Sequence, residues 1–485
     1  MEKWRKWGFQ CEENSFKRLK KGSVLESQND IKSADQYLSS SAQSINVDEK
    51  LLHFVLSPNK NEELFPSSAI PDLYFEKGNF VFLPFEEESK WKLIKHSISQ
   101  RIETVEDLEE VFNSYNQKKV NFTGLNYYFN EHFSKTKNFF INILPKMQKS
   151  LLNLPVLFKD LKIPILKKNV NSCITLNKEQ IFSLISNLFF CTISQNHNIN
   201  LPSTLFKTLF ESVERNGILN SKICGKMDCI MNYFERMAEN LSEGNVTFQR
   251  RCIPEEKLPD WGNLDSFHLK NTDCRYLGTI EDDGFGCSQV DFANKNIGGG
   301  VLSRECLIVI GLERFSNYRG YGETFQFSSN FCDKSGKDAL LRFKSEFVAI
   351  DALHFNNSKK SKMQQYEKDL IIRELNKAYI GFLKSEVTCF DESRLVDLAT
   401  GNWGCGAFNG DKQLKFLIQY IAASACSRNL RFFTFGDEFF ANKIINLIPF
   451  LKNVSLGKLF RIITSFHSDG EGDLFNYVNY KLKNQ

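Results

Sequence analysis

Residues 395–435 constrain the fold more than any other part of the chain. They contain an apolar run, Leu395–Ala399, then a glycine-rich loop, an amphipathic run, Asp411–Ala425, and a second apolar run, Leu430–Phe435. The apolar runs have the length and composition of buried strands, and the run between them repeats apolar residues at three- and four-residue steps. Such a unit joins parallel neighbours through a right-handed crossover. The sequence therefore predicts a largely parallel sheet with a helix on one face.

The rest of the chain divides into a helical region and a mixed region. Between residues 85 and 245 apolar residues recur at helical spacing, as from Gln180 to Phe190, so we predict an all-α accessory domain there. From residue 246 to 485, short runs such as Gln289–Ala293, Cys306–Ile310 and Phe347–Ala352 alternate with helical patterns such as Lys362–Tyr379, which is typical of an α/β domain. Residues 1–50 are rich in polar side chains, and we expect a disordered leader.

Composition excludes several classes of protein. The 62 Lys and Arg against 58 Asp and Glu leave a net charge of +4, which argues against direct binding of duplex nucleic acid. Apolar stretches are far shorter than the ~20 residues of a membrane span, and the first residues lack the apolar core of a secretory signal. We therefore expect an intracellular chain that binds no membrane. The basic cluster Lys17–Lys21 is either a nuclear import signal or solvated charge.

Cysteine and histidine usage argues against a disulfide framework and against a metal site. The 13 cysteines include no C-x-x-C pair, and the 7 histidines show no ligand spacing. We expect reduced thiols, no metal and no cofactor.

The loop from Thr400 to Asp411 is the strongest candidate for binding chemistry. It lies between a strand and a helix, which is where open α/β sheets bind ligands. Its glycines allow close approach of a ligand, and free amides before the helix attract a phosphate or diphosphate. The alternative is an ordinary tight turn. The glycine and aromatic content favours an anion site.

A second glycine-rich segment, Val290–Val301, places Asp291 and Asn294 beside three glycines, Gly298, Gly299 and Gly300. Close backbone approach to a sugar or phosphate is one interpretation, and a glycine-rich turn with a solvated acid is the other. Two exposed aromatic positions are also suggestive, since Tyr321 lies between glycines and Phe435 ends a strand at the edge that carries the Thr400–Asp411 loop. Each is also consistent with an ordinary surface turn.

Several strings, in this order, resemble the poly(ADP-ribose) glycohydrolases. In the mixed region these are GTIEDDG (278–284), VDFANKNIGGGV (290–301), ECLIVIG (305–311), YRGYGETF (318–325), EFVAIDALHF (346–355), RELNKAYIGFL (373–383), ATGNWGCGAFNGD (399–411) and FFTFGD (432–437). In the helical region, ILPKMQKSLLNLP (143–155), ITLNKEQIFSLISNLFFCT (174–192) and GNVTFQRR (244–251) resemble the accessory domain of the same family.

The resemblance implies a macrodomain-like mixed sheet flanked by helices, preceded by the helical accessory domain, with ADP-ribose bound across the carboxyl edge of the sheet. It implies that Ile280 and Glu281 meet the adenine, that Asn294 meets the ribose near the scissile bond, and that Tyr321 and Phe435 pack on the ligand. It gives Asp291 the place of an acid near the reacting ribose. It assigns the diphosphate to the backbone amides of Asn402, Trp403, Gly404, Cys405, Gly406 and Ala407.

One departure from the family pattern concerns the catalytic acid. In the family, Gly-Gly-Gly is followed by a Gln-Glu-Glu triplet, whose second glutamate protonates the departing ribose oxygen. Here Gly300 is followed by Val-Leu-Ser-Arg and then Glu305, and no such triplet occurs nearby. A block holding the catalytic loop and the helix after it is therefore predicted to be missing. Glu305 is a candidate substitute, and a strand-initiating solvated glutamate is the alternative.

Two functions follow as expectations. The first is hydrolysis of the ribose–ribose O-glycosidic bonds of poly(ADP-ribose), which the resemblance connects with the response to DNA damage, in the nucleus or the cytoplasm. The second is a catalytically silent module, or a splice form, that binds ADP-ribose or the polymer end. In both cases the expected partners are poly(ADP-ribose) and ADP-ribosylated proteins, and we expect a monomer.

Overall fold

The computed structural model describes residues 52–56, 80–116, 119–158, 162–193, 205–212, 221–294, 305–356, 358, 363–391, 396–469 and 472–484. The chain is divided into two units, the first Met1–Asp48 and the second Glu49–Gln485. All the described residues belong to the second unit. The predicted disordered leader and the cluster Lys17–Lys21 lie outside the described residues, as do Gly298, Gly299 and Gly300.

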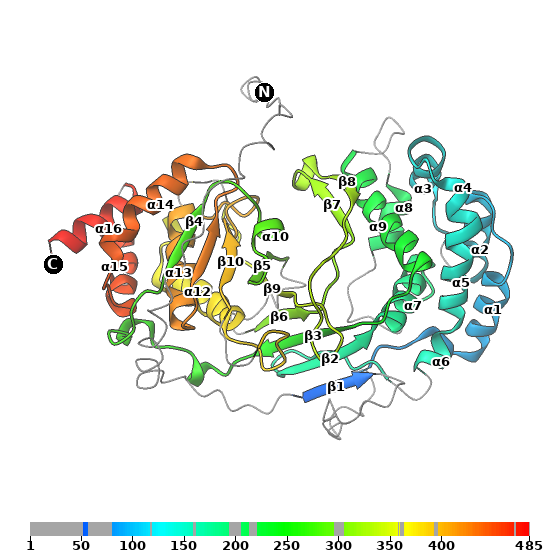
Figure 1. The fold of residues 1–485 in the computed structure, drawn as a ribbon, viewed down its shortest axis with the longest axis horizontal. Coiled ribbons are helices and arrows are strands. Elements are labelled where there is room, and N and C mark those ends of the chain that lie inside the picture. The colour runs from blue at the N-terminus through cyan, green and yellow to red at the C-terminus, as the bar shows by residue number, and fades with distance from the viewer. Residues whose placement is uncertain are drawn as a thin grey trace, which may run out of the picture. The chain divides into compact units, whose positions relative to one another are not determined.

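A mixed sheet of nine strands organises the second unit, in the order β1-β2-β3-β6-β9-β5-β10-β11-β4 (Figure 1). A separate pair, β7 and β8, forms an antiparallel hairpin. The strands are β1 Leu52–Leu56, β2 Ser172–Asn177, β3 Asn245–Cys252, β4 Thr272–Arg275, β5 Ser288–Phe292, β6 Glu305–Ile310, β7 Ser316–Arg319, β8 Gln326–Asn330, β9 Glu346–Ile350, β10 Leu398–Gly401 and β11 Leu430–Phe433.

Strand direction confirms the predicted parallel unit. Strands β9, β5, β10, β11 and β4 are parallel neighbours, so their carboxyl ends meet at one edge. β10 and β11 are joined through α13, which spans Lys412–Ala425 and begins after the N-cap Asp411. β6 runs antiparallel to both β3 and β9, which makes the whole sheet mixed.

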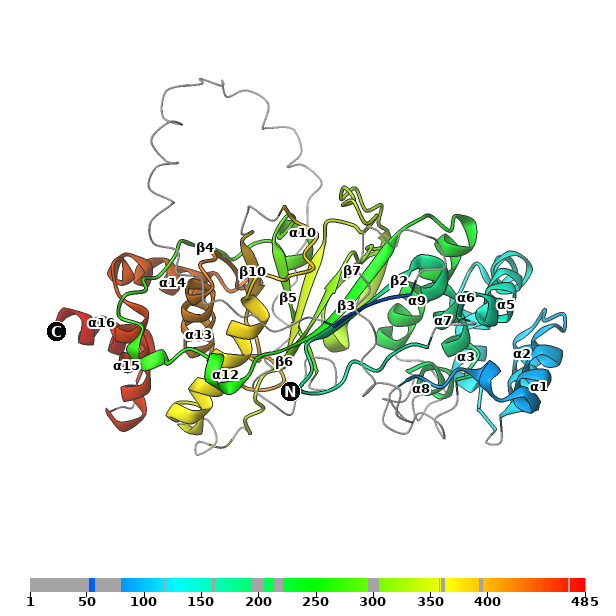
Figure 2. The ribbon, with the colours of Figure 1, turned by 90° about the horizontal axis from the view of Figure 1, so that it is seen from below.

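Helices on both sides of the sheet supply the hydrophobic cores. They are α1 Glu88–Ile98, α2 Val105–Tyr115, α3 Thr123–Tyr127, α4 Thr136–Asn138, α5 Leu144–Leu152, α6 Leu154–Phe158, α7 Lys178–Phe189, α8 Leu205–Glu211, α9 Ser221–Glu239, α10 Ile280–Asp283, α12 Lys368–Phe382, α13, α14 Glu438–Leu451, α15 Leu456–Asp469 and α16 Leu474–Lys483. Helices α12 and α13 pack side by side against the sheet (Figures 1 and 2), where Val348 and Ile350 of β9 are fully buried against them. A second core, rich in phenylalanine, joins α1, α2, α3, α5, α7 and α9.

The prediction of a helical region from 85 to 245 needs one correction. Within that range β2 is a strand, and it pairs with β1 on one side and β3 on the other. Its residues, Ser172–Leu176, are all buried, so no alternation of polar and apolar residues marks them as a strand. The helical region therefore contributes a strand to the same sheet that carries the α/β half of the chain.

No helix among the described residues is long and apolar enough to cross a bilayer. The twelve cysteines in this part of the chain are free thiols. No group of three or more His, Cys, Asp or Glu side chains in the same ranges is arranged to hold a metal ion.

Candidate functional site

The carboxyl edge of the parallel strands opens into a cavity of about 1090 Å³. Its walls come from α10, the end of β5, the β7–β8 hairpin, and the residues that follow β9, β10 and β11. The predicted site residues that line it are Ile280, Glu281, Asp291, Tyr321, Asn402, Trp403, Gly404, Gly406, Ala407 and Phe435. Ten positions proposed from five separate segments of sequence thus meet in one cavity.

The loop after β10 presents backbone donors to this cavity. Gly404 has a φ of 74°, a conformation that L side chains rarely adopt. In the described part of the chain, the amide groups of Gly404, Gly406 and Ala407 have no hydrogen-bond acceptor, and all three residues line the cavity. Unpaired amides that converge on a cavity before a helix form a binding site for an anion.

Two of the six amides assigned to the diphosphate are engaged within the loop. The Trp403 amide donates to the Gly401 carbonyl at 2.7 Å, and the Cys405 amide donates to the Asn402 carbonyl at 3.0 Å. Cys405 also does not line the cavity. The indole of Trp403 is fully buried, and its Nε1 donates to the Ile350 carbonyl at 3.1 Å. Trp403 therefore ties the loop to the end of β9.

Two exposed aromatic rings lie at the rim of the cavity. Tyr321, on the β7–β8 hairpin, is 82% exposed and lies between Gly320 and Gly322, both at positive φ. Phe435 follows β11 at a φ of 54° and is 46% exposed, with its ring edge-on to Phe292 at 6.5 Å between centroids. A large side chain held in the left-handed region is rare and strained. Both rings are free to pack against a bound ligand.

The end of the cavity near α10 combines an apolar floor with an acid. Ile280 is buried, and the Glu281 carboxylate accepts a hydrogen bond from the hydroxyl of Tyr318 on β7. Arg314 forms an ion pair with Asp282 at 2.6 Å. These contacts join α10 to the β7 hairpin and fix the width of the cavity.

Asp291 is the cavity acid that remains available to a ligand. Its side chain is partly exposed, lines the cavity and has no hydrogen-bond partner in the described ranges. Partial burial raises the pKa of its carboxyl above the usual value, and the nearby Glu281 carboxylate adds to the rise. By contrast, Glu313 pairs with Lys178 at 2.5 Å, and Asp333 accepts the Arg314 amide at 3.1 Å.

Glu305 does not line the cavity. Its carboxylate is fully buried at the start of β6, where it pairs with Arg250 at 2.6 Å and accepts the Asn169 amide. The alternative of a solvated glutamate is also wrong, because the side chain has no exposure. Asn294 is exposed beyond the end of β5 and likewise does not line the cavity.

Several lining residues were not proposed from sequence, among them Phe285, Arg314, Tyr318, Phe331, Phe347 and Phe408. Tyr318 and Phe408 lie within the strings that carry the resemblance, so neighbouring sequence was a usable signal for them. Phe347 also lies within one of these strings, and the strand register places it on β9 opposite Gln289 of β5, where both residues line the cavity.

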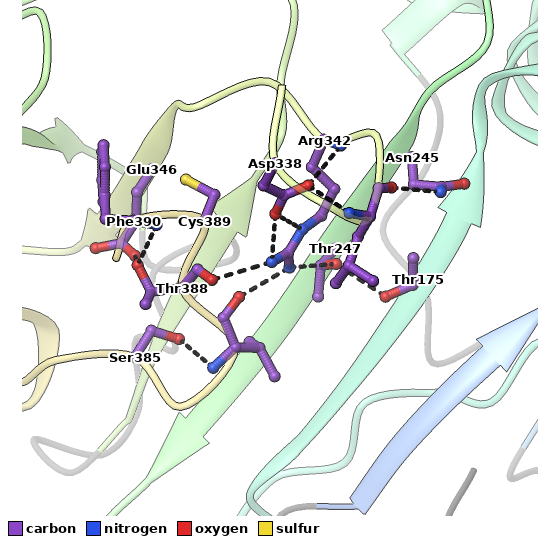
Figure 3. A network of polar contacts seen from close by, with 12 residues as sticks. Thr175, Asn245, Thr247, Asp338, Arg342, Glu346, Ser385, Thr388, Cys389 and Phe390 are labelled. Carbon is purple, nitrogen blue, oxygen red and sulfur yellow. Dashed lines mark hydrogen bonds and ion pairs between the residues drawn. The ribbon is translucent and has the colours of Figure 1, made fainter. Parts of the chain in front are cut away.

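A buried network supports the wall that includes Lys344, Ser345 and Phe347 (Figure 3). Arg342 is 2% exposed, pairs with Asp338 at 2.8 Å and donates to the Thr247 hydroxyl at 3.1 Å. Its guanidinium also donates to the carbonyls of Val387 and Thr388, and the Thr388 hydroxyl donates to Glu346 at 3.0 Å. The network holds the segment before β9 against the sheet.

Two family models match this chain. The model described as poly(ADP-ribose) glycohydrolase, macro domain fold, matches residues 258–307 and 301–442, and the model described as poly(ADP-ribose) glycohydrolase, helical domain, matches residues 132–250. The first model matches in two stretches that both include residues 301–307, a range that ends within β6.

Curated relatives agree with the family models. A probable poly(ADP-ribose) glycohydrolase 2 of Arabidopsis thaliana is 26% identical over 436 residues, covering 71% of this chain and 82% of that protein. Poly(ADP-ribose) glycohydrolases 1 and 2 of Caenorhabditis elegans are 32% and 30% identical, each covering 59% of this chain and, respectively, 42% and 67% of the relative. This chain belongs to the poly(ADP-ribose) glycohydrolase family.

Proposed function

We propose that this chain hydrolyses the ribose–ribose O-glycosidic bonds of poly(ADP-ribose) and releases ADP-ribose. One observation carries the proposal: the free amides of Gly404, Gly406 and Ala407, the free carboxyl of Asp291 and the rings of Tyr321 and Phe435 line the same cavity. An ADP-ribose unit requires this combination, since it joins a diphosphate to a ribose on one side and an adenosine on the other.

The proposed binding mode follows from where each kind of group lies. The diphosphate accepts hydrogen bonds from the loop amides, whose partial positive charges stabilise it. The adenine lies against Ile280 and Phe435, and its polar edge faces Glu281. The reacting ribose then lies near Asp291, and Tyr321 covers the ligand.

In this proposal Asp291 is the general acid that donates a proton to the departing ribose oxygen. Cleavage of a glycosidic bond passes through an oxocarbenium-like transition state, which needs a proton on the departing oxygen and a water molecule at the anomeric carbon. A positioned acid contributes roughly 10²–10⁴-fold, and a carboxyl with a raised pKa retains its proton closer to neutral pH. The raised pKa of Asp291 fits this role. Glu305 is left out, because its carboxylate is committed to Arg250.

Binding without turnover is the second candidate. It is favoured by the position of Glu305 outside the cavity and by the family model that matches residues 301–307 twice, as expected if a block of the family pattern has no counterpart here. In this version the cavity recognises the polymer end and leaves the bond intact. Under either candidate we propose ADP-ribosylated proteins as partners, a nuclear or cytoplasmic location, a role in the response to DNA damage, and a monomeric protein.

Release of free ADP-ribose from purified poly(ADP-ribose) separates the two candidates. Hydrolysis predicts release by the wild-type chain that falls at least 100-fold in Asp291→Asn, by the magnitude of acid catalysis, and is unchanged in Asp369→Asn, an exposed acid on α12. No release from a folded protein that binds ADP-ribose would contradict hydrolysis and support the binding module. Elution at a dimer's volume in size-exclusion chromatography would contradict the monomer.

A further inference from the structure

Five charged side chains lie together beneath the loop that follows β10. They are Asp351 after β9, Arg373, Glu374 and Lys377 on α12, and Lys415 on α13. The side chains of Asp351, Glu374, Lys377 and Lys415 are at most 3% exposed, and that of Arg373 is 17% exposed. Three cations and two carboxylates leave the cluster with one excess positive charge.

Direct contacts hold the cluster together. Lys415 pairs with Glu374, and Arg373 pairs with both Glu374 and Asp351, the latter at 2.7 Å. Lys377 lies 3.0 Å from the other oxygen of Asp351. The cluster therefore joins two helices to the end of β9, at the edge where the cavity opens.

Lys415 touches the underside of the loop itself. Its Nζ lies 4.0 Å from the centroid of the Trp403 ring. A Cβ atom added to Gly404 would lie 3.4 Å from this Nζ, and one added to Gly410 would lie 3.1 Å from the Lys415 Cε. The ammonium thus lies against the Trp403 ring, on the side of Gly404 to which a side chain would project. Among the described residues the Gly404 amide has no acceptor, and Gly404 lines the cavity.

An excess charge in the protein interior is unfavourable unless something compensates it. Among the described residues, the charged groups that act on Lys415 are Glu374 and Arg373 from α12 and Asp351 from beyond β9. Burial lowers the pKa of the Lys415 ammonium well below its usual range, and repulsion by Arg373 adds to this. An anion bound on the other side of the loop is the missing counter-charge.

We propose that Lys415 is a positioning residue for the diphosphate, and that binding of ADP-ribose is coupled to retention of the proton on its ammonium. The inference rests on the proposed function, because it needs ADP-ribose to bind with its diphosphate on the loop amides. Lys415 does not touch the ligand. It acts through Trp403 and the backbone around Gly404, which it supports, and through the field of its buried charge.

Calorimetric titration of the wild-type chain with ADP-ribose, and with adenosine as a ligand without phosphate, tests the coupling. Between pH 7 and pH 9.5 the affinity for ADP-ribose is expected to fall roughly tenfold, because a bound anion raises the proton affinity of the cluster. Binding should take up a proton, which appears as a dependence of the heat on the ionisation enthalpy of the buffer. The affinity for adenosine should not change with pH.

Lys415→Met is expected to weaken ADP-ribose at least tenfold at pH 7 and to abolish both the pH dependence and the proton uptake. Lys412→Met is the matched control, because Lys412 lies on the same helix, is 43% exposed and pairs with Asp437. If Lys415→Met does not fold because Glu374 is left without its partner, the double variant Lys415→Met/Glu374→Gln removes that buried charge and is tested in its place.

Tight ADP-ribose binding with no proton uptake and no pH dependence in the wild-type chain would overturn the inference and leave the proposed function intact. If Lys415→Met lost affinity for ADP-ribose but retained the pH dependence of binding, Lys415 would have only a structural role, and the inference would also be overturned. Absence of any ADP-ribose binding by the folded wild-type chain would refute the proposed function itself.

Discussion

Replacing Gly404 by alanine tests the geometry of the anion site. The added Cβ would lie 2.5 Å from the Cβ of Ala352, far inside normal contact, and the residue would have to keep a φ of 74°. Gly406 is the matched control, because it lines the same cavity, lies two residues along the same loop, and an added Cβ there meets nothing within 4 Å.

The expected changes in the free energy of unfolding follow from these contacts. A left-handed conformation costs alanine about 1–2 kcal/mol, and crowding in a packed interior costs about 1–3 kcal/mol. Reduced freedom of the unfolded chain returns about 0.4–1 kcal/mol to any Gly→Ala change. The expected loss in the free energy of unfolding is therefore about 1–4 kcal/mol for Gly404→Ala, and Gly406→Ala should lie within about 0.5 kcal/mol of wild type or slightly above it.

The affinity for ADP-ribose should also differ between Gly404→Ala and Gly406→Ala. Displacement of the Gly404 amide removes a charge-assisted hydrogen bond to the diphosphate, which corresponds to roughly a tenfold to hundredfold loss of affinity for ADP-ribose. Urea unfolding and calorimetric titration measure the two effects. Equal stability and equal ADP-ribose affinity of Gly404→Ala and Gly406→Ala would refute the described loop geometry.

Three further predictions concern other parts of the structure. Arg342→Met should lower the free energy of unfolding, measured in urea, by about 3–5 kcal/mol, because the largely buried Asp338 loses its partner. Arg461→Met is the control: it breaks an exposed pair and should lower the free energy of unfolding by less than about 1 kcal/mol. Asp291→Asn should raise the melting temperature at pH 7, since folding raises the pKa of this acid and disfavours its charged form. The gain should vanish at a pH below the pKa of the unfolded acid, where Asp291 is protonated in both states, and a gain that persists there would contradict the assignment. Tyr321→Ala should weaken ADP-ribose binding about tenfold with no change in melting temperature, because the ring is 82% exposed. Phe439→Ala is the control and should change neither quantity, because Phe439 is 74% exposed and does not line the cavity.

The strand–loop–helix–strand unit was predictable because its signals are local. Glycines, the N-cap Asp411 and apolar periodicity all lie within about one turn of the elements they define, and α13 and β11 formed near the predicted bounds. β10 ends at Gly401, two residues beyond the predicted end at Ala399, so the predicted loop begins later than Thr400. β2 was missed for the opposite reason. Its buried run continues directly into α7, whose capping box of Asn177 and Gln180 marks the helix and gives no sign of a preceding strand.

At the candidate site, too, local sequence predicted single residues but not how they come together. Ile280, Tyr321 and Phe435 were identified through the strings around them, and their convergence depends on strand order that no single string contains. The role of Glu305 depends on Arg250, which lies 55 residues earlier and reaches it only because β3 pairs with β6. Whether a loop amide is free was also beyond sequence, since the internal bonds of Trp403 and Cys405 depend on backbone angles.

Titration of the folded wild-type chain with ADP-ribose tests the central claim most directly, because hydrolysis and binding without turnover both require this ligand in the same cavity. The account predicts saturable binding at one site per chain, much tighter than that of adenosine, and weakened in Gly404→Ala. Failure of ADP-ribose to bind, or binding no tighter than that of adenosine and unaffected by Gly404→Ala, would contradict it.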